Sequence, residues 1–261
     1  MQKGTVIHTL IVAVLVCLVC SLLVSVSAVT LKSKQIANAS YNEQVNIVMT
    51  AGLLNAHQIA DKNLVNKVFS NIDSKIVELS SGQFVDMDVH AFSLNTLLAD
   101  KQTSKALTSS DDIAGLKRLE NFSKVYMVQK DNKLDTLILP IRGYGLWSTL
   151  YGYIALESDF NTVRGLIFYK HAETPGLGGE VDNPEWQKSW RGKKLFADSN
   201  SVQLSLVKGG VDPSAPMSKT QYQVDALAGA TLTSRGINNL LTFWFSDKGF
   251  KNFLQNYKQS I

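Results

Sequence analysis

The feature that most constrains this chain is an apolar run near its N-terminus. From Gly4 to Leu31 the sequence has 28 residues without Asp, Glu, Lys or Arg, and Val, Leu, Ile and Ala dominate it. A membrane helix needs about 20 apolar residues, so this run is long enough to cross a bilayer. The alternative is a signal peptide cleaved after Val26-Ser27-Ala28, but the apolar part of such peptides usually has only about 7 to 15 residues. The length favours a retained membrane anchor, which we assign to residues 1–34.

Charge and cysteine content limit what the remaining chain can do. Three of the 26 basic residues precede residue 35, so residues 35–261 carry 23 basic and 22 acidic side chains, and we expect no nucleic-acid partner. Lysines on both sides of the anchor leave its orientation undecided. Cys17 and Cys20 both lie in the apolar run, where we interpret them as small apolar residues. The remaining chain therefore has no disulfide or cysteine nucleophile, a composition that suits an oxidising compartment.

Hydrophobic periodicity predicts an α+β fold after the anchor. Residues 35–82 have apolar side chains at near-helical spacing, and we expect residues 35–123 to form the largely helical part of the soluble domain. From residue 124 the pattern changes to short runs rich in β-branched and aromatic residues, which are typical of strands. Residues 124–261 are therefore expected to combine an antiparallel sheet with helices.

Two parts of this second region can be predicted in more detail. Val125–Gln129 and Thr136–Ile141 flank the polar turn Asp131-Asn132-Lys133 and predict a β-hairpin. Helices are predicted over Asn183–Arg191 and from Thr233 to Phe253. Together these elements favour one soluble domain built on a sheet.

The segment Asp225–Gly236 presents a threonine among very small neighbours, directly before the last predicted helix. The first-turn amides of a helix have no partners inside the helix, and its N-terminus carries partial positive charge. Such an end is suited to a phosphate, and the small residues 228–230 would let a large ligand reach the Thr231 hydroxyl. The alternative is an ordinary capping threonine at a loop-to-helix junction.

Two further segments combine glycines with chemically distinctive side chains. His171–Glu180 reads His-Ala-Glu-Thr-Pro-Gly-Leu-Gly-Gly-Glu, in which Pro175-Gly176 predicts a tight turn and the glycines permit close approach of a ligand. Gly143–Gly152 places Trp147 among small residues, where it is either a core side chain or a stacking surface for an aromatic ring.

The three segments in this order, together with the anchor, resemble the flavoprotein family that contains the C subunit of the sodium-translocating NADH:quinone oxidoreductase and the G subunit of the Rnf complex. The family's flavinylation motif is Asp-x-x-Ser/Thr-Gly-Ala-Thr, and this sequence differs from it only at Ala228, where a hydroxyl is missing. The resemblance implies FMN bound covalently through its phosphate to Thr231, with FAD as donor and a flavin transferase as partner. The other cofactor-binding residues it implies are Asp225, Gly229, Ala230, Leu232, Thr233, Glu173, Thr174, Gly176, Leu177 and Trp147.

This resemblance implies a membrane-anchored subunit that relays electrons within a sodium-pumping complex and is inactive alone. The soluble domain would lie on the periplasmic side of the bacterial inner membrane, with the other subunits as partners. We expect no catalytic side chain and no metal, since His57 and His90 lack a second imidazole at ligand spacing. The alternatives are the Rnf G subunit and a non-redox envelope protein whose domain only binds or assembles.

Overall fold

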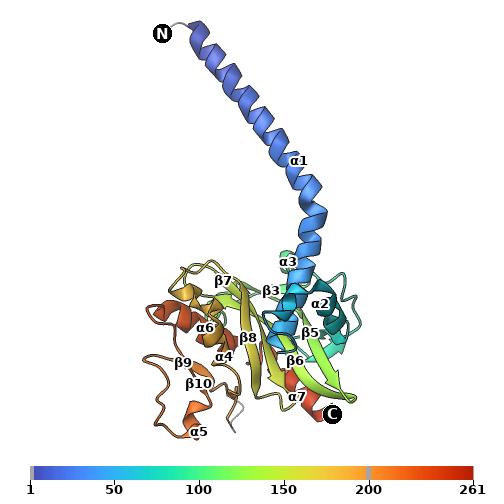
Figure 1. The fold of residues 1–261 in the computed structure, drawn as a ribbon, viewed down its shortest axis with the longest axis vertical. Coiled ribbons are helices and arrows are strands. Elements are labelled where there is room, and N and C mark those ends of the chain that lie inside the picture. The colour runs from blue at the N-terminus through green and yellow to red at the C-terminus, as the bar shows by residue number, and fades with distance from the viewer. Residues whose placement is uncertain (1–2, 198–200, 261) are drawn as a thin grey trace. The chain divides into compact units, whose positions relative to one another are not determined.

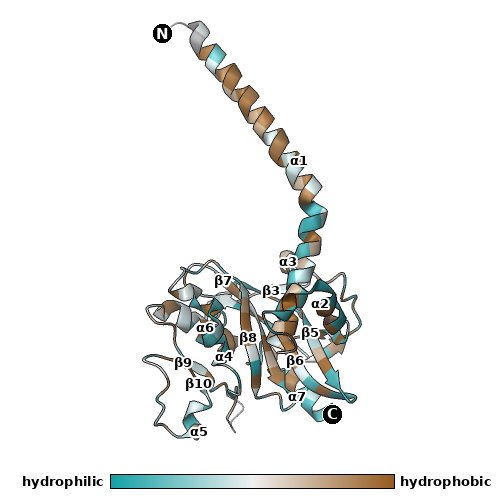
Figure 2. Cartoon of the chain, viewed as in Figure 1, coloured by the Kyte–Doolittle hydropathy of each residue, from teal (hydrophilic) through white to brown (hydrophobic). Residues whose placement is uncertain are grey.

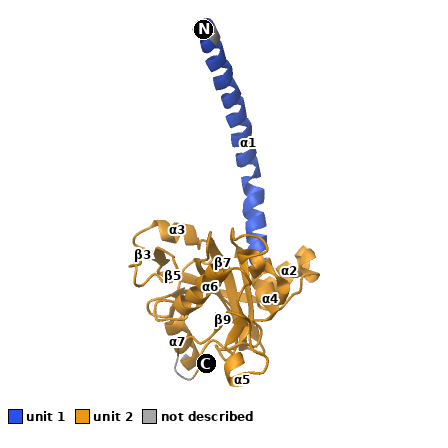
Figure 3. Cartoon of the chain, turned by 90° about the vertical axis from the view of Figure 1, so that its left-hand side faces the viewer, with its two compact units in different colours: residues 1–44 blue, residues 45–261 orange. Residues whose placement is uncertain are grey.

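The computed structural model describes residues 3–197 and 201–260, and its first element is one long helix. Helix α1 spans Lys3–Thr50, and the chain divides into two compact units, residues 1–44 and 45–261 (Figure 3). Between Val6 and Leu31 the large apolar side chains are exposed, as the brown colouring of α1 in Figure 2 shows. By length and composition this helix can cross a membrane.

The end of α1 belongs to the second unit. Ile47 and Val48, in the last turn of α1, and Ala51, just after it, are buried in this unit. The chain continues through the short helix η1 (Gln58–Ala60) and α2 (Lys62–Phe69). Asp61 caps α2, because its carboxylate accepts hydrogen bonds from the first-turn amides.

The helical pattern predicted over residues 35–82 ends at Phe69, and the prediction is wrong for the residues that follow. Strand β1 spans Ile72–Glu78. Ile72 and Ile76 are both buried on it, and a spacing of four places side chains on one face of a strand as well as of a helix. The predicted periodicity was therefore compatible with either structure, and pairing with a neighbouring strand decided it.

Six strands in the described part of the chain form one antiparallel sheet (Figure 1). Residues Asp131 and Asn132, which join two of its strands, both have positive φ, as a two-residue hairpin turn requires, and the predicted hairpin is confirmed. In spatial order the strands are β2 (Gln83–Val85), β1, β5 (Phe122–Lys130), β6 (Lys133–Tyr144), β7 (Thr149–Glu157) and β8 (Val163–Lys170).

This sheet contains strands from both sides of residue 124, where the sequence pattern changes. Strand β1 pairs with β5, with Ile76 opposite Lys124, so residues before and after 123 share one sheet. The intervening chain forms α3 (Leu94–Ala99) and a small sheet of β3 (Ser104–Ala106) and β4 (Arg118–Glu120). The α+β class with an antiparallel sheet is confirmed.

The helix predicted from Thr233 to Phe253 is two helices that pack on the main core. They are α6 (Thr231–Trp244) and α7 (Lys251–Ser260). The break lies at Gly249, where a Cβ atom would stand 2.2 Å from the Trp244 carbonyl oxygen. The chain can fold back this tightly only without a side chain, and it lets Phe250 stack on Trp244 with ring centroids 5.2 Å apart.

The remaining short elements carry the loops of the site. They are η2 (Gly178–Asp182), α4 (Pro184–Lys188), β9 (Ser205–Val207), α5 (Met217–Thr220) and β10 (Gln223–Asp225). Helix α4 lies within the helix predicted at residues 183–191. Strands β9 and β10 form a small parallel pair. After β10 the chain makes a turn and enters α6, the next element in the sequence.

Candidate flavin site

Thr231 is the first residue of helix α6, two residues before the predicted start. Gly229 has φ +71° in the turn that leads into the helix, a conformation that favours glycine. The Ser234 hydroxyl accepts the Leu227 amide at 3.0 Å and fixes this turn. Ala230, the capping residue, makes no side-chain cap, so the amides of Thr231 and Leu232 have no hydrogen-bond partner among the described residues.

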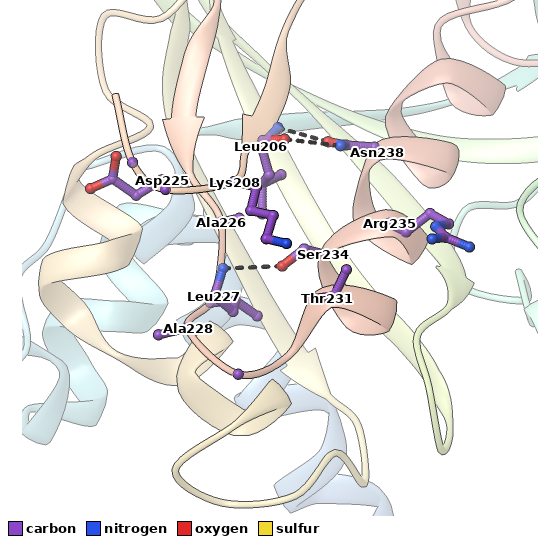
Figure 4. A pocket seen from close by; sticks show the side chains of 13 residues that line it. Leu206, Lys208, Asp225, Ala226, Leu227, Ala228, Thr231, Ser234, Arg235 and Asn238 are labelled. Carbon is purple, nitrogen blue, oxygen red and sulfur yellow. Dashed lines mark hydrogen bonds between the residues drawn. The ribbon is translucent and has the colours of Figure 1, made fainter. Parts of the chain in front are cut away.

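Thr231 lines a cavity of about 470 Å³, which Figure 4 shows between α6, the end of β9 and the turn after β10. Lys208 and Arg235 also line it, and neither side chain has an ion-pair or hydrogen-bond partner among the described residues. Two unpaired cations and a helix N-terminus suit a phosphate group. The full lining is Leu206, Lys208, Gly209, Gly210, Asp225, Ala226, Leu227, Ala228, Gly229, Thr231, Ser234, Arg235 and Asn238.

Side-chain hydrogen bonds hold the walls of this cavity. Asn238 on α6 accepts the Leu206 amide at 2.7 Å and donates to the Leu206 carbonyl at 3.2 Å, which ties the helix to β9. Asp225 accepts the Val211 amide at 2.7 Å and so holds the Lys208–Gly210 turn. Its carbonyl also accepts a hydrogen bond from the Trp186 indole at 2.9 Å. Asp225 therefore shapes the loop that carries Lys208.

The His171–Glu180 segment contacts the Asp225–Gly236 segment through Glu173. Glu173 is 5% exposed, and its carboxylate accepts a hydrogen bond from the Thr233 hydroxyl of α6 at 2.8 Å. It also accepts the amides of Leu146, Trp147 and Ser148 at 3.0 to 3.2 Å, together with the Ser148 hydroxyl. Burial raises the pKa of the Glu173 carboxyl, but the hydrogen bonds from these groups outweigh burial and hold the pKa below its ordinary value.

The close packing of these segments explains why glycines occur in them. A Cβ atom on Gly145 would stand 2.7 Å from a Glu173 oxygen, and one on Gly178 would stand 2.6 Å from the Thr233 hydroxyl. A Cβ on Gly229 would stand 2.9 Å from the Leu177 side chain, so the second motif also touches the turn before Thr231. The three segments, far apart in sequence, thus form one site.

The predicted site residues separate into an exposed and a buried group. Trp147, Leu177 and Leu232 are 66%, 43% and 48% exposed, which is unusual for large apolar side chains. The other exposed members are Thr174, Gly176, Asp225, Gly229 and Thr231. By contrast, Glu173, Ala230 and Thr233 are buried.

Sequence reasoning missed several residues that line the cavity. Ser234 and Arg235 lie in the Asp225–Gly236 segment, a few residues after the flavinylation motif ends at Thr231, so their position was a usable signal. Lys208 is followed by two glycines with positive φ, a pattern that indicates a turn and nothing more. Asn238 gives no signal at all, because its role depends on where β9 packs.

Comparison with known proteins agrees with this geometry. The family model described as the FMN-binding domain matches residues 145–246, which contain the Thr231 and Glu173 motifs and Trp147. The C subunit of the Na⁺-translocating NADH-quinone reductase from Pseudomonas aeruginosa is 48% identical over 253 residues, with 97% of this chain and 96% of that protein covered. The corresponding subunit of Yersinia pestis is 42% identical, with 96% and 92% covered.

A solved structure supports the same relationship. The crystal structure of NqrC from Shewanella oneidensis has a TM-score of 0.75 and 34% identity, covering 85% of this chain and 99% of that one. The likeness therefore extends over nearly the whole sequence and over the fold. With an apolar anchor helix and an FMN-binding domain match, this chain belongs to the NqrC family, the C subunits of the Na⁺-translocating NADH-quinone reductase.

Proposed function

We propose that this chain is a membrane-anchored flavoprotein subunit that carries FMN on Thr231 and relays electrons within a Na⁺-translocating NADH-quinone reductase. The observation that carries the proposal is the exposed Thr231 residue at the start of α6, beside a cavity with two unpaired cations among the described residues. The family membership and the FMN-binding domain match support the flavin. FMN supplies one-electron and two-electron transfer when it is bound.

The covalent attachment is a phosphoryl transfer. The Thr231 hydroxyl oxygen attacks the FMN phosphorus of FAD, a new P–O bond forms, and the pyrophosphate P–O bond breaks to release AMP. A flavin transferase would catalyse this step and take up the hydroxyl proton. Lys208, Arg235 and the first-turn amides of α6 are available to stabilise the phosphate charge.

The exposed apolar side chains near Thr231 are candidates for contact with the flavin ring. Trp147, Leu177 and Leu232 leave large apolar surfaces exposed beside the motifs. Contact with an aromatic ring system would bury them. Gly176 has φ +74°, and a Cβ atom added to it would have no other atom within 4 Å, so the turn leaves room there.

The remaining reaction steps are assigned to partner subunits. The chain has no nicotinamide-binding fingerprint, and a single anchor cannot enclose an ion pathway. We therefore assign NADH oxidation, quinone reduction and sodium movement to the other subunits. The soluble domain is proposed to lie on the periplasmic side, where flavin transferases of this type act. A reporter fused after Ile261 that is active only in the cytoplasm would contradict this orientation.

The test of the attachment is peptide mass analysis of protein made together with a flavin transferase. We expect the mass of FMN on the peptide that contains Thr231, and yellow colour that survives denaturation. Thr231→Ala should give folded, colourless protein, while Thr231→Ser, which keeps a hydroxyl, should retain some flavin. FMN on another peptide would contradict the assignment, and colourless wild-type protein would favour a non-redox binding module.

A further inference from the structure

We infer that Glu173 is a positioning residue that holds the loop of Trp147 against the first turn of α6. Its Oε1 atom accepts the amides of Trp147 and Ser148 at 3.0 and 3.1 Å, and its Oε2 atom accepts the Thr233 hydroxyl at 2.8 Å. One carboxylate therefore joins two segments that lie far apart in the sequence. The inference rests on the proposed function, because these are the segments assigned to the flavin.

A direct contact between Glu173 and the flavin is the less favoured role. The Glu173 residue is 5% exposed, and both oxygens of its carboxylate already accept hydrogen bonds from the protein. The exposed surface of the site comes instead from Trp147 and from residues beside Thr231. Glu173 thus acts on the site through the groups that it holds.

An ionised carboxylate suits this position, because it accepts hydrogen bonds at both of its oxygens. The groups that reach its oxygens are three amides and two hydroxyls, all of which can donate. Hydrogen bonds to a carboxylate are stronger than those between neutral groups. A glutamine has one acceptor oxygen: with that oxygen in the Oε1 place, its NH₂ group faces the Thr233 hydroxyl, which can then no longer donate to the side chain, and the remaining bonds lose the strength that the charge gives them.

The surroundings of Glu173 are built to fit the side chain closely. Gly145 and Gly178 come within 2.7 and 2.8 Å of its oxygens when a Cβ atom is added, so any larger residue would displace the carboxylate. On the other side, the Glu173 amide donates to His171 Nδ1 at 3.2 Å, and His171 Nε2 lies 3.0 Å from Asp182. The carboxylate is thus fixed by its own backbone as well as by its partners.

The first test is hydrogen exchange measured by mass spectrometry on full-length, flavin-free protein. Glu173→Gln should speed exchange by about tenfold or more in peptides covering residues 145–150 and 231–240 together, because it weakens both sets of bonds. The control is Glu180→Gln, which removes the same charge from the same loop. The Glu180 carboxylate accepts a hydrogen bond from Asn183 and, among the described residues, makes none to either segment, so exchange in the Glu180→Gln variant should match the wild type there.

The second test is the midpoint potential of flavin-loaded protein, which a residue that stabilises the fold away from the flavin would not change. Glu173→Gln removes a buried negative charge and loosens the Trp147 loop, so the potential should become more positive than in Glu180→Gln. Unchanged exchange, or faster exchange with an unchanged potential, would overturn the inference. If the protein takes up no flavin, the proposed function fails while the exchange test still stands.

Thr233→Val and Ser148→Ala cover the case in which Glu173→Gln does not fold. Each removes one hydroxyl donor and leaves the carboxylate in place. We expect Thr233→Val to speed exchange mainly in residues 231–240 and Ser148→Ala mainly in residues 145–150. Equal, wild-type exchange in both variants would show that Glu173 does not join the two segments and would overturn the inference.

Discussion

At the scale of single residues, the two cations of the cavity make no ion pair or hydrogen bond within the described part of the chain. Lys208 and Arg235 line the cavity beside Thr231 without an ion pair, whereas other charged side chains such as Arg164 are paired. An unpaired cation next to a helix N-terminus adds to the positive potential there. These two residues are therefore available to stabilise the phosphate of the proposed flavin donor.

Replacing these cations should slow the proposed attachment of FMN to Thr231. We expect Lys208→Gln and Arg235→Gln each to lower the rate of transfer to Thr231 by about tenfold, which corresponds to the loss of one charge-assisted contact. Lys67→Gln makes the same charge change on an exposed position of α2 and should leave the rate unchanged. The measurement is the fraction of flavinylated protein against time, and equal rates in all three variants would contradict the prediction.

The Glu173 carboxylate should also make stability depend on pH. Its pKa in the folded protein lies below the ordinary value of 4.5, so its contribution is present above that value and is lost as pH falls through the folded pKa. At pH 7 we expect Glu173→Gln to lower the free energy of unfolding by about 1–3 kcal/mol. Urea unfolding at several pH values should show this difference shrinking below pH 4.5, and a constant difference would contradict it.

At the scale of elements, the site depends on how closely α6 packs on the end of β6. A Cβ atom on Gly236 would stand 2.3 Å from the Tyr144 carbonyl oxygen, and one on Gly143 would stand 2.8 Å from the Leu240 side chain. This close approach brings the start of α6 next to the loop that carries Trp147. The geometry of the flavin site is therefore set by two glycines outside its surface.

Gly236→Ala distinguishes this packing from ordinary helix propensity. In an open helix, glycine to alanine stabilises by about 1 kcal/mol. Here the added methyl group would meet backbone atoms, so we expect destabilisation by about 1–3 kcal/mol. Thermal or urea unfolding gives the sign directly, and a stabilised variant would mean that α6 does not rest on the Tyr144 carbonyl.

At the scale of the whole molecule, the boundary between anchor and domain lies within one helix. Residues 45–261 contain the sheet, the site and the core, and the last turns of α1 belong to this unit, where Ile47 and Val48 are fully buried. The membrane segment and the domain therefore share α1, but the domain needs only the end of it.

Two truncations test this division. Protein that begins at residue 45 should be soluble and should keep the stability of the domain, since the described residues that are removed contribute no buried core residue. Protein that begins at residue 52 also loses Ile47 and Val48, and we expect it to be less stable by at least about 2 kcal/mol. Equal unfolding midpoints for the two proteins would contradict the assignment of these residues to the core.

Features that depend on local composition could be predicted from the amino-acid sequence. The anchor follows from 28 uncharged residues, and the hairpin follows from an Asp-Asn turn between β-rich runs. The three motifs were readable because each is continuous in the chain. The local sequence pattern did not identify the strand Ile72–Glu78, because apolar residues four positions apart, such as Ile72 and Ile76, lie on one face of a helix and of a strand alike.

How the three motifs act together depends on contacts that form only in the folded domain. Whether β1 is a strand depends on its pairing with β5, and whether α6 starts beside Trp147 depends on packing at Gly236. Glu173 was predicted as a cofactor residue, yet its hydrogen bonds to Trp147 and Thr233 join segments that no local pattern connects. Such contacts depend on distances between residues far apart in sequence, which chain folding sets and which spacing along the chain does not record.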